Sequence, residues 1–297
     1  MAFLSIERVS KYFPVLEGAT ARGRAAAFCV FQDVDLRMDK GEFVTLVGHS
    51  GCGKSTLLNI IAGFEQVSTG GVILDGKEVT VPSLDRMVVF QSFALMPWLT
   101  AFDNVRLAVR AAHATWDKAR VRDETYKYLD MMGLRGAELK KPALLSGGMR
   151  QRVGLARAFA VQPKVLLLDE PFAQIDALTR GVIQEELLRM WTATQHTVFM
   201  VTHDVDEAIL LSDRIALMTN GPAARLAECV EVNLPRPRSR EAMIDTAEYT
   251  RLRNHILHFL LRASHAMPSH DALQSTRNGP GHLATPASVI PSAHRPE

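Results

Sequence analysis

Gly48-His49-Ser50-Gly51-Cys52-Gly53-Lys54-Ser55-Thr56 is the stretch of this chain that decides its fold. The apolar run before it, residues 42–47, is typical of a buried strand, and residues 54–64 have helical spacing with Gly63 near the end. A strand, a glycine-rich turn and a helix in this order place backbone N–H groups and a helix N-terminus against phosphate oxygens. Glycine is needed where the backbone must approach the phosphates closely. The segment therefore predicts a phosphate-binding loop.

The polar side chains of this loop predict a nucleoside triphosphate with Mg²⁺ as its ligand. Lys54 would place a positive charge on the β and γ phosphates, and Ser55 can ligate Mg²⁺. Cys52 is expected to be a small filler rather than a nucleophile, although Lys54 and the helix N-terminus beside it favour a lowered thiol pKa. A flexible turn that happens to contain a lysine is the alternative, which the flanking strand and helix disfavour.

Two acids close a second buried strand. The apolar run 165–168 is followed by Asp169-Glu170-Pro171. Adjacent strand residues point in opposite directions, so Asp169 suits the Mg²⁺ shell while Glu170 suits a general base that orients the attacking water. A charged turn after a core strand is the alternative, and it loses weight beside a phosphate loop.

Two further polar residues follow buried strands. His203 comes after the run 197–201, where its side chain could reach the γ-phosphate and hold the water and Glu170 in place. Gln91 follows the strand at 87–90 and offers an amide to the metal or to the water. A structural histidine and a solvated loop glutamine are the respective alternatives.

The pattern along the chain predicts a mostly β start, a helical insertion and a parallel α/β core. Residues 3–9 and 31–38 are strand-like, residues 104–114 and 117–132 have helical spacing, and a helix pattern at 176–195 separates two β-rich runs. We expect an ATP-binding domain at 3–235 with a helical subdomain at about 97–157. A C-terminal helical extension at 236–262 and a disordered tail at 263–297, rich in Pro, Ser, His and Gly, would follow.

Composition disfavours several classes of function. The formal net charge of +2 comes without a concentrated basic stripe, so direct nucleic-acid binding is not expected. Three scattered cysteines suit a reducing compartment and offer no metal-ligand spacing. No apolar run approaches the roughly eighteen residues of a membrane span, so membrane contact would go through a partner.

A second phosphate-reading segment, Leu145-Ser146-Gly147-Gly148-Met149-Arg150-Gln151, completes a pattern that resembles the ATP-binding subunits of ABC transporters over residues 3 to about 262. The resemblance implies a P-loop NTPase fold of the α/β class, with a RecA-like core, an N-terminal antiparallel β subdomain and an inserted α-helical subdomain. It also implies that Ser146, Gly147 and Gly148 of one subunit, in a segment that ends at Gln151, close on the ATP of a second subunit in a head-to-tail dimer.

The resemblance adds two more positions to the nucleotide site. Phe13 holds the place of the aromatic residue that stacks on adenine, with Tyr12 as a rival and ordinary strand packing as the alternative. Gln174-Ile175-Asp176 stands where the family's dimer-contact loop usually reads Ala-Leu-Asp, a departure that keeps the acid of Asp176.

Several stretches look most like nitrate importers and their cyanate and sulfonate relatives, namely residues 85–91, 97–100 and 204–208, with closer nitrate-type echoes at 210–214, 220–222 and 234–238. This similarity implies nitrate or nitrite uptake, with a taurine or aliphatic sulfonate importer and a cyanate importer as alternatives. The implied partners are transmembrane permease subunits, a periplasmic or extracellular solute-binding protein on a separate chain, and a second ATP-binding subunit. The chain would then lie peripherally on the cytoplasmic face of the inner membrane.

The apolar residues Leu95, Met96, Trp98 and Leu99 predict a groove for a cytoplasmic helix of the membrane partner, while packing within the helical lobe is the alternative. An ABC-type ATPase acting on DNA or ribosomes is disfavoured, because the long coiled coils or paired cassettes usual there are missing. A non-hydrolysing subunit is disfavoured because Glu170 and His203 are intact. The long loop at 17–28 indicates no role.

Overall fold

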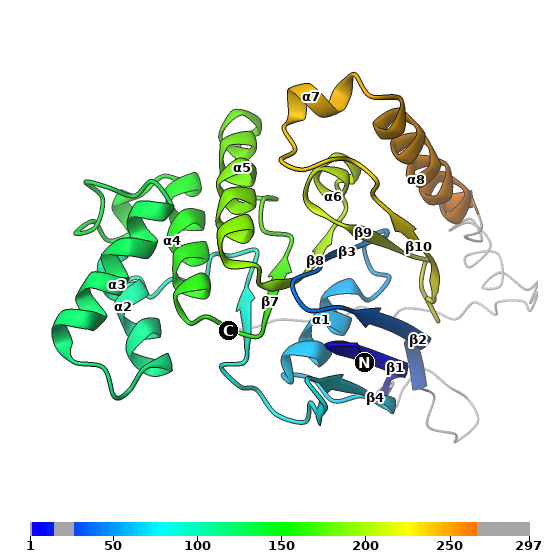
Figure 1. The fold of residues 1–297 in the computed structure, drawn as a ribbon. Helices are drawn as coiled ribbons and strands as arrows, with labels where there is room; N and C mark the ends of the chain where they lie inside the picture. Colours follow the sequence, from blue (N-terminus) through cyan, green and yellow to red (C-terminus); the bar gives the residue numbers. More distant parts are fainter. Residues whose placement is uncertain (1, 15–26, 266–297) are drawn as a thin grey trace, which may run out of the picture.

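The computed structural model describes residues 2–14 and 27–265 (Figure 1). The predicted disordered tail lies outside the described residues from 266 onward, and so does most of the loop predicted at 17–28. Residues 263–265, which we expect in the tail from sequence, instead end the last helix, α8 (Ala247–His265).

A six-stranded sheet forms the centre of the molecule, with strand order β10-β9-β3-β8-β7-β6. Every neighbouring pair from β9 to β6 is parallel, and β10 joins β9 antiparallel. The strands are β3 (Phe43–Val47), β6 (Arg86–Val89), β7 (Val165–Asp169), β8 (Thr197–Thr202), β9 (Arg214–Met218) and β10 (Leu226–Glu231). This topology confirms the predicted parallel α/β core.

The central strands are apolar throughout because both faces of the sheet are covered. In β3, Phe43 and Val47 join one hydrophobic core while Val44 and Leu46 join the other. Helix α1 (Lys54–Ala62) packs into the second core, between the two sheets in Figure 1. On the opposite face, the first core includes residues of α4 (Gly147–Ala160), α5 (Ala177–Thr194) and α6 (Val205–Leu211), and further helices of the helical lobe and the C-terminal extension add to it.

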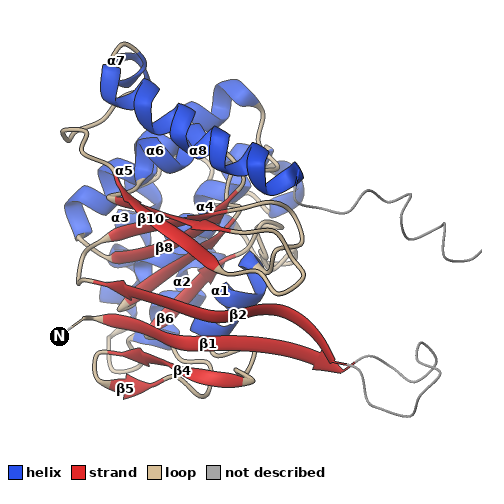
Figure 2. Cartoon of the chain, turned by 90° about the vertical axis from the view of Figure 1, so that its right-hand side faces the viewer, coloured by secondary structure: helices blue, strands red, loops and turns tan. Residues whose placement is uncertain are grey.

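A smaller antiparallel sheet, with order β2-β1-β4-β5, also contributes residues to the second core. Its strands are β1 (Leu4–Pro14), β2 (Ala27–Met38), β4 (Thr69–Leu74) and β5 (Lys77–Glu78). Figure 2 shows this sheet below the six-stranded one. The predicted N-terminal antiparallel subdomain is therefore present.

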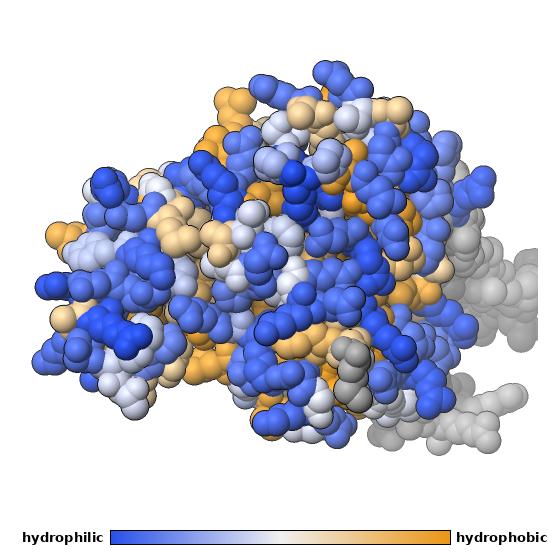
Figure 3. All heavy atoms as spheres, in the orientation of Figure 1, coloured by the Kyte–Doolittle hydropathy of each residue, from blue (hydrophilic) through white to orange (hydrophobic). Residues whose placement is uncertain are grey.

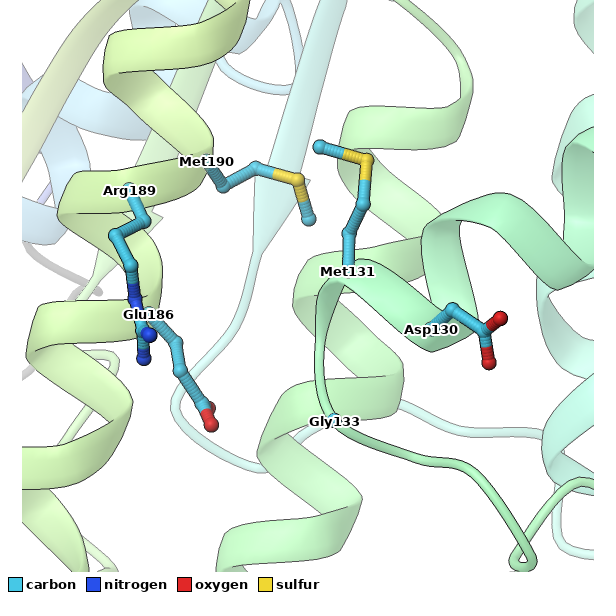
Figure 4. A pocket seen from close by; sticks show the side chains of 6 residues that line it. All are labelled: Asp130, Met131, Gly133, Glu186, Arg189 and Met190. Atoms are coloured by element: carbon cyan, nitrogen blue, oxygen red, sulfur yellow. The ribbon is translucent and has the colours of Figure 1, made fainter.

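A helical lobe lies at one end of the sheet, on the left in Figure 1. It contains α2 (Ala101–Ala112), α3 (Lys118–Met131), the 3₁₀ turn η1 (Pro142–Leu144) and α4. Helix α2 begins three residues before the predicted start at 104, because Thr100 caps it by accepting a hydrogen bond from the Asp103 N–H. An open hollow of about 340 Å³ separates the end of α3 from α5. Met131 and Met190 point toward each other across it (Figure 4).

The C-terminal extension contains α7 (Arg240–Ile244) and α8, and α8 packs against α6. A buried guanidinium fastens the start of this extension: Arg238 donates hydrogen bonds to the backbone carbonyls of Ile209, Ser212, Val232 and Leu234. The face in Figure 3 is mostly hydrophilic, with small apolar patches. Within residues 2–14 and 27–265, none of the helices combines the length and the apolar character that crossing a bilayer requires.

Candidate nucleotide site

The phosphate loop connects the carboxyl end of β3 to α1, as predicted. Gly53 has φ +100°, and a Cβ atom added there would lie 2.7 Å from a methyl carbon of Val30, so glycine is required at this position. The Lys54 ammonium lies across the loop and donates to the carbonyls of Gly48 at 2.7 Å and His49 at 3.0 Å. Lys54 therefore stands over the backbone that would surround a phosphate.

Ser55 and Asp169 are brought together by the strand order. The Ser55 hydroxyl donates to Asp169 Oδ1 at 2.9 Å, joining the first turn of α1 to the end of β7. Burial raises the pKa of Asp169, and the Ser55 hydrogen bond opposes that rise. One hydroxyl and one carboxylate are oxygen ligands of the type that Mg²⁺ takes, so this pair fits the predicted metal site.

Glu170 and His203 also meet, at the ends of neighbouring strands. His203 Nδ1 lies 3.3 Å from Glu170 Oε1, and the Glu170 N–H donates to the Val201 carbonyl at 3.0 Å. Glu170 has φ +44°, a left-handed backbone conformation that a non-glycine residue adopts only under constraint and that clusters at functional sites. The arrangement aims a carboxylate and an imidazole at the same side of the sheet as the phosphate loop.

Gln91 lies at the same edge on the next strand. Strand β6 pairs with β7 through Val89 and Leu168, so Gln91, two residues further on, is level with Glu170. Its side chain is exposed on the turn that leads into the helical lobe. Its role at the metal or the water stays a prediction, and among the described residues no hydrogen bond joins its side chain to Ser55 or Asp169.

The second phosphate-reading segment opens α4. Ser146 is the N-cap of this helix and accepts a hydrogen bond from the Met149 N–H at 3.2 Å. A Cβ atom on Gly148 would lie 2.5 Å from Thr179 Cγ2, so glycine allows α4 to pack closely on α5. Gly147 lies beside the Gln174 carbonyl. The second phosphate-reading segment, here called the signature segment (145–151), therefore lies next to the predicted dimer-contact loop.

Gln151 and Asp176 differ in their exposure. Gln151 is fully buried in α4, so the structure turns it away from the surface on which Ser146 lies. Asp176 is exposed and caps α5, and the N–H and hydroxyl of Thr179 lower its pKa. Of the two, Asp176 is available to a ligand or a second subunit in this conformation.

Tyr12 and Phe13 both lie near the end of β1, and each is 37% exposed. Phe13 pairs across the ladder with Phe28 of β2, and the Lys11 ammonium lies 4.8 Å from the centre of its ring. Either aromatic ring is accessible, so the structure leaves the choice between them where the sequence left it.

Cys52 has the buried position expected of a filler, but its thiol pKa is not lowered. Its side chain is 1% exposed, and burial raises the pKa of the thiol. Lys54 lowers that pKa, but the effect of burial is larger. The structure supports a filler role and opposes a lowered thiol pKa, because the depth of the loop beneath β2 and α1 cannot be inferred from neighbours in sequence.

Two features of the site escaped the sequence analysis. The imidazole of His49 lies 2.9 Å from the carbonyl oxygen of Leu260 in α8, a contact between residues 211 positions apart. Glu207, one helical turn beyond His203, helps to line a polar cavity of about 50 Å³ whose wall also includes Glu170, Ala173, Arg180, Thr202, His203 and Asp204. The available signal for Glu207 in the sequence was its position as a carboxylate four residues after His203.

Comparison with known proteins gives a consistent result. The family described as "ABC transporter" matches residues 31–173. The chain is 48% identical over 260 residues to the nitrate import ATP-binding protein NrtD of Synechococcus elongatus, covering 88% of this chain and 92% of that protein. It is also 48% identical to the bicarbonate transport ATP-binding protein CmpD of a Synechocystis species, covering 87% of this chain and 89% of that protein.

Among solved structures, the dimeric post-hydrolysis state of the ATP-binding cassette MJ0796 bound to ADP and Pi superimposes with a TM-score of 0.66 and 29% identity. The match covers 78% of this chain and 100% of that one. A second dimeric structure of the same cassette gives a TM-score of 0.67. On the sequence identity, the coverage and the shared fold, this chain belongs to the ATP-binding proteins of the ABC transporter family.

Proposed function

We propose that the chain is the ATP-hydrolysing subunit of an ABC importer. The observation that carries the proposal is the Glu170–His203 contact of 3.3 Å, beside the Ser55–Asp169 hydrogen bond of 2.9 Å. Both pairs stand at the carboxyl edge of the parallel sheet next to the phosphate loop, which is where ligands bind in open α/β sheets.

The residues divide the work of phosphoryl transfer. Backbone N–H groups of the loop and the Lys54 ammonium hold the phosphates, while Ser55 and Asp169 would hold Mg²⁺. Mg²⁺, when bound, neutralises charge on the β and γ phosphates. Glu170 is placed to accept a proton from the attacking water, and His203 to hold that water and the γ-phosphate in line.

A second ATP-binding subunit would complete the site. The phosphate loop leads into α1, in the core on one face of the sheet, whereas Ser146, Gly147 and Gly148 open α4 on the other face. A head-to-tail dimer would bring the signature segment of one subunit to the ATP of the other. The two solved structures of the similar cassette are dimeric, which supports this proposal.

For the transported solute, nitrate or nitrite remains our first proposal. The relatives named for nitrate and for bicarbonate are equally similar at 48% identity, so bicarbonate is the second candidate. Taurine or aliphatic sulfonates and cyanate are further alternatives. All imply separate permease subunits and a solute-binding protein, with this chain held peripherally on the cytoplasmic side of the membrane and without direct contact to nucleic acid.

Trp98 supports the proposed contact with a permease. Its side chain is 66% exposed, and Met96 is 36% exposed, whereas Leu95 and Leu99 are partly buried. The segment therefore presents an indole to solvent directly before α2, beside the loop that carries Gln91. An exposed tryptophan is typical of an interaction surface.

The ATPase proposal is tested with the full chain and the variant Glu170→Gln. Loss of the base should lower kcat by about 10²- to 10⁴-fold and leave an ATP-bound dimer visible by size-exclusion chromatography. The matched control is Glu185→Gln, since Glu185 is exposed on α5. Glu170→Gln turnover equal to that of the control would refute the assigned role.

Solute and partner are tested after reconstitution with the permease and solute-binding subunits encoded beside it. ATP hydrolysis should be stimulated by nitrate or nitrite, whereas stimulation by bicarbonate alone would transfer the proposal to that anion. Trp98→Ala should uncouple hydrolysis from uptake while basal ATPase persists. Unchanged coupling would mean that Trp98 only packs the lobe.

A further inference from the structure

A chain of hydrogen bonds links the C-terminal extension to the backbone on both sides of His203. Arg240 of α7 donates to Gln184 Oε1 through Nε at 3.2 Å and through Nη2 at 2.5 Å. Gln184 Nε2 donates to Glu207 Oε1 at 3.0 Å. The Thr202 hydroxyl donates to Glu207 Oε2 at 2.8 Å and accepts from the Asp204 N–H at 3.1 Å. We name this chain, from Arg240 to Asp204, the relay.

The ends of the relay determine the direction of its outer bonds, and the protonation state of Glu207 determines that of the bond to Thr202. Arginine can only donate, so the oxygen of the Gln184 amide must face Arg240 and its NH₂ group must face Glu207. The Asp204 N–H can also only donate, so the Thr202 hydroxyl accepts from it, and with Glu207 ionised the hydroxyl gives its own hydrogen to the carboxylate. Both carboxyl oxygens therefore receive hydrogens, an arrangement that matches the ionised form of Glu207.

The middle of the relay is closed to solvent. Thr202, Gln184 and Glu207 are 2%, 0% and 3% exposed. A donor or acceptor left without a partner at such depth costs more than the bond itself contributes, so a change at one end should be felt along the chain. Satisfying buried polar groups is the ordinary role of such a network. This network has a further role because it ends on Thr202 and Asp204, the residues directly before and after His203.

We propose that Glu207 is a positioning residue for His203, held in its doubly accepting arrangement by Gln184 and, from the C-terminal extension, by Arg240. The inference rests on the proposed ATPase function. It deepens that function by making α7 part of the support of the switch histidine. The shared cavity of about 50 Å³, with Glu170, His203 and Glu207 in its wall, places the supporting carboxyl directly behind the reacting groups.

The charges that face Glu207 bear on how this support depends on pH. Burial and then the Asp204 carboxylate raise the pKa of Glu207 to about 7, while Arg180 and His203 lower it. Glu170 faces the same cavity. Protonation of Glu207 would let it donate to the Thr202 hydroxyl and so reverse that bond, so the doubly accepting arrangement should be lost on the acid side of neutrality.

The test uses steady-state ATP hydrolysis by the full chain across pH 5.5–9, with the variants Arg240→Ala, Thr202→Val and both together. Each single change should lower kcat about fivefold, the scale of one hydrogen bond, while KM for ATP stays within about twofold. Because both changes break one relay, the double variant should be no slower than the slower single variant. Arg240→Ala should also move the acid limb of the kcat profile to higher pH, and Arg240→Lys should recover most of the rate.

The matched control is Arg251→Ala, which removes an exposed ion pair with Glu248 on α8 outside the relay. The relay would be overturned if Arg240→Ala kept the wild-type kcat, or if its effect on kcat added fully to that of Thr202→Val. The proposed function would still stand in that case, provided that Glu170→Gln abolished ATP hydrolysis. A wild-type chain whose activity is insensitive to Glu170→Gln would refute the proposed function and the relay with it.

Discussion

We predict that Glu207 makes the folded chain less stable as the pH rises, which is the opposite of the usual effect of a carboxyl group. Burial first, and the Asp204 charge second, raise its pKa from 4.5 to about 7. Between these values the folded chain holds a proton that the unfolded chain has released. At 1.36 kcal/mol for each pH unit, the difference amounts to about 3 kcal/mol. This stabilisation is complete below the unfolded pKa and is lost as the pH rises through 7.

The perturbation is the variant Glu207→Gln, which keeps the shape of the side chain and removes its titration. Urea unfolding at intervals from pH 4 to pH 8.5 would be followed through tryptophan fluorescence, with Trp191 buried as a reporter of the core. The free energy of unfolding of the wild type minus that of the variant should fall by about 3 kcal/mol across this range.

A control of opposite sign is Glu248→Gln. The Arg251 guanidinium donates to Glu248 and lowers its pKa, so its contribution is present at neutral pH and lost on acidification. Exposure to solvent keeps that contribution small. A wild-type minus Glu207→Gln difference that stays level from pH 4 to pH 8.5 would refute the reasoning, since it would mean that Glu207 titrates alike in both states.

Two further substitutions test the anchoring of the C-terminal extension and the phosphate loop. Arg238→Met should destabilise the chain by about 3 kcal/mol, because several buried carbonyls lose their donor. Only part of this loss is recovered, since the variant no longer buries a charge. Thermal denaturation measures the effect, and an unchanged melting temperature would contradict it. Gly53→Ala should weaken binding of a fluorescent ATP analogue at least about tenfold, because the new Cβ meets Val30 at a positive φ. Gly76→Ala, at φ +75° in open space, is its control and should bind normally.

Local pattern was sufficient for the elements that carry the site. The helix expected at 176–195 is α5, with Asp176 as its N-cap and Gln195 as its C-cap, and the N-cap is readable from residue type. The phosphate loop was equally readable, since its glycines, its lysine and the flanking apolar runs lie within one short segment. The sequence analysis assigned Ser55 and Asp169, 114 residues apart, to one Mg²⁺ site, but it could not supply the direct hydrogen bond between them, which depends on the order of the strands.

Burial explains where sequence reasoning went wrong. Beside Lys54 in the sequence, Cys52 looked like a thiol with a lowered pKa, but its depth raises that pKa instead. Glu207, which the sequence analysis did not single out, is enclosed between α5 and β8. In both cases the distance to water decides the outcome, and that distance depends on elements remote in the chain.

The C-terminal extension reaches the site at three points, and their positions argue for one mechanical unit. Through the relay, Arg240 supports the segment around His203. Tyr249 and Arg253 of α8 both donate to Asp206, on the helix that His203 precedes. The Leu260 carbonyl meets His49 within the phosphate loop. The last two contacts are both made by α8. One side of α8 therefore contacts the helix that follows His203, and its end contacts the phosphate loop. These contacts lie within one subunit, so α8 connects the segment around His203 to the phosphate loop without any contribution from a second subunit.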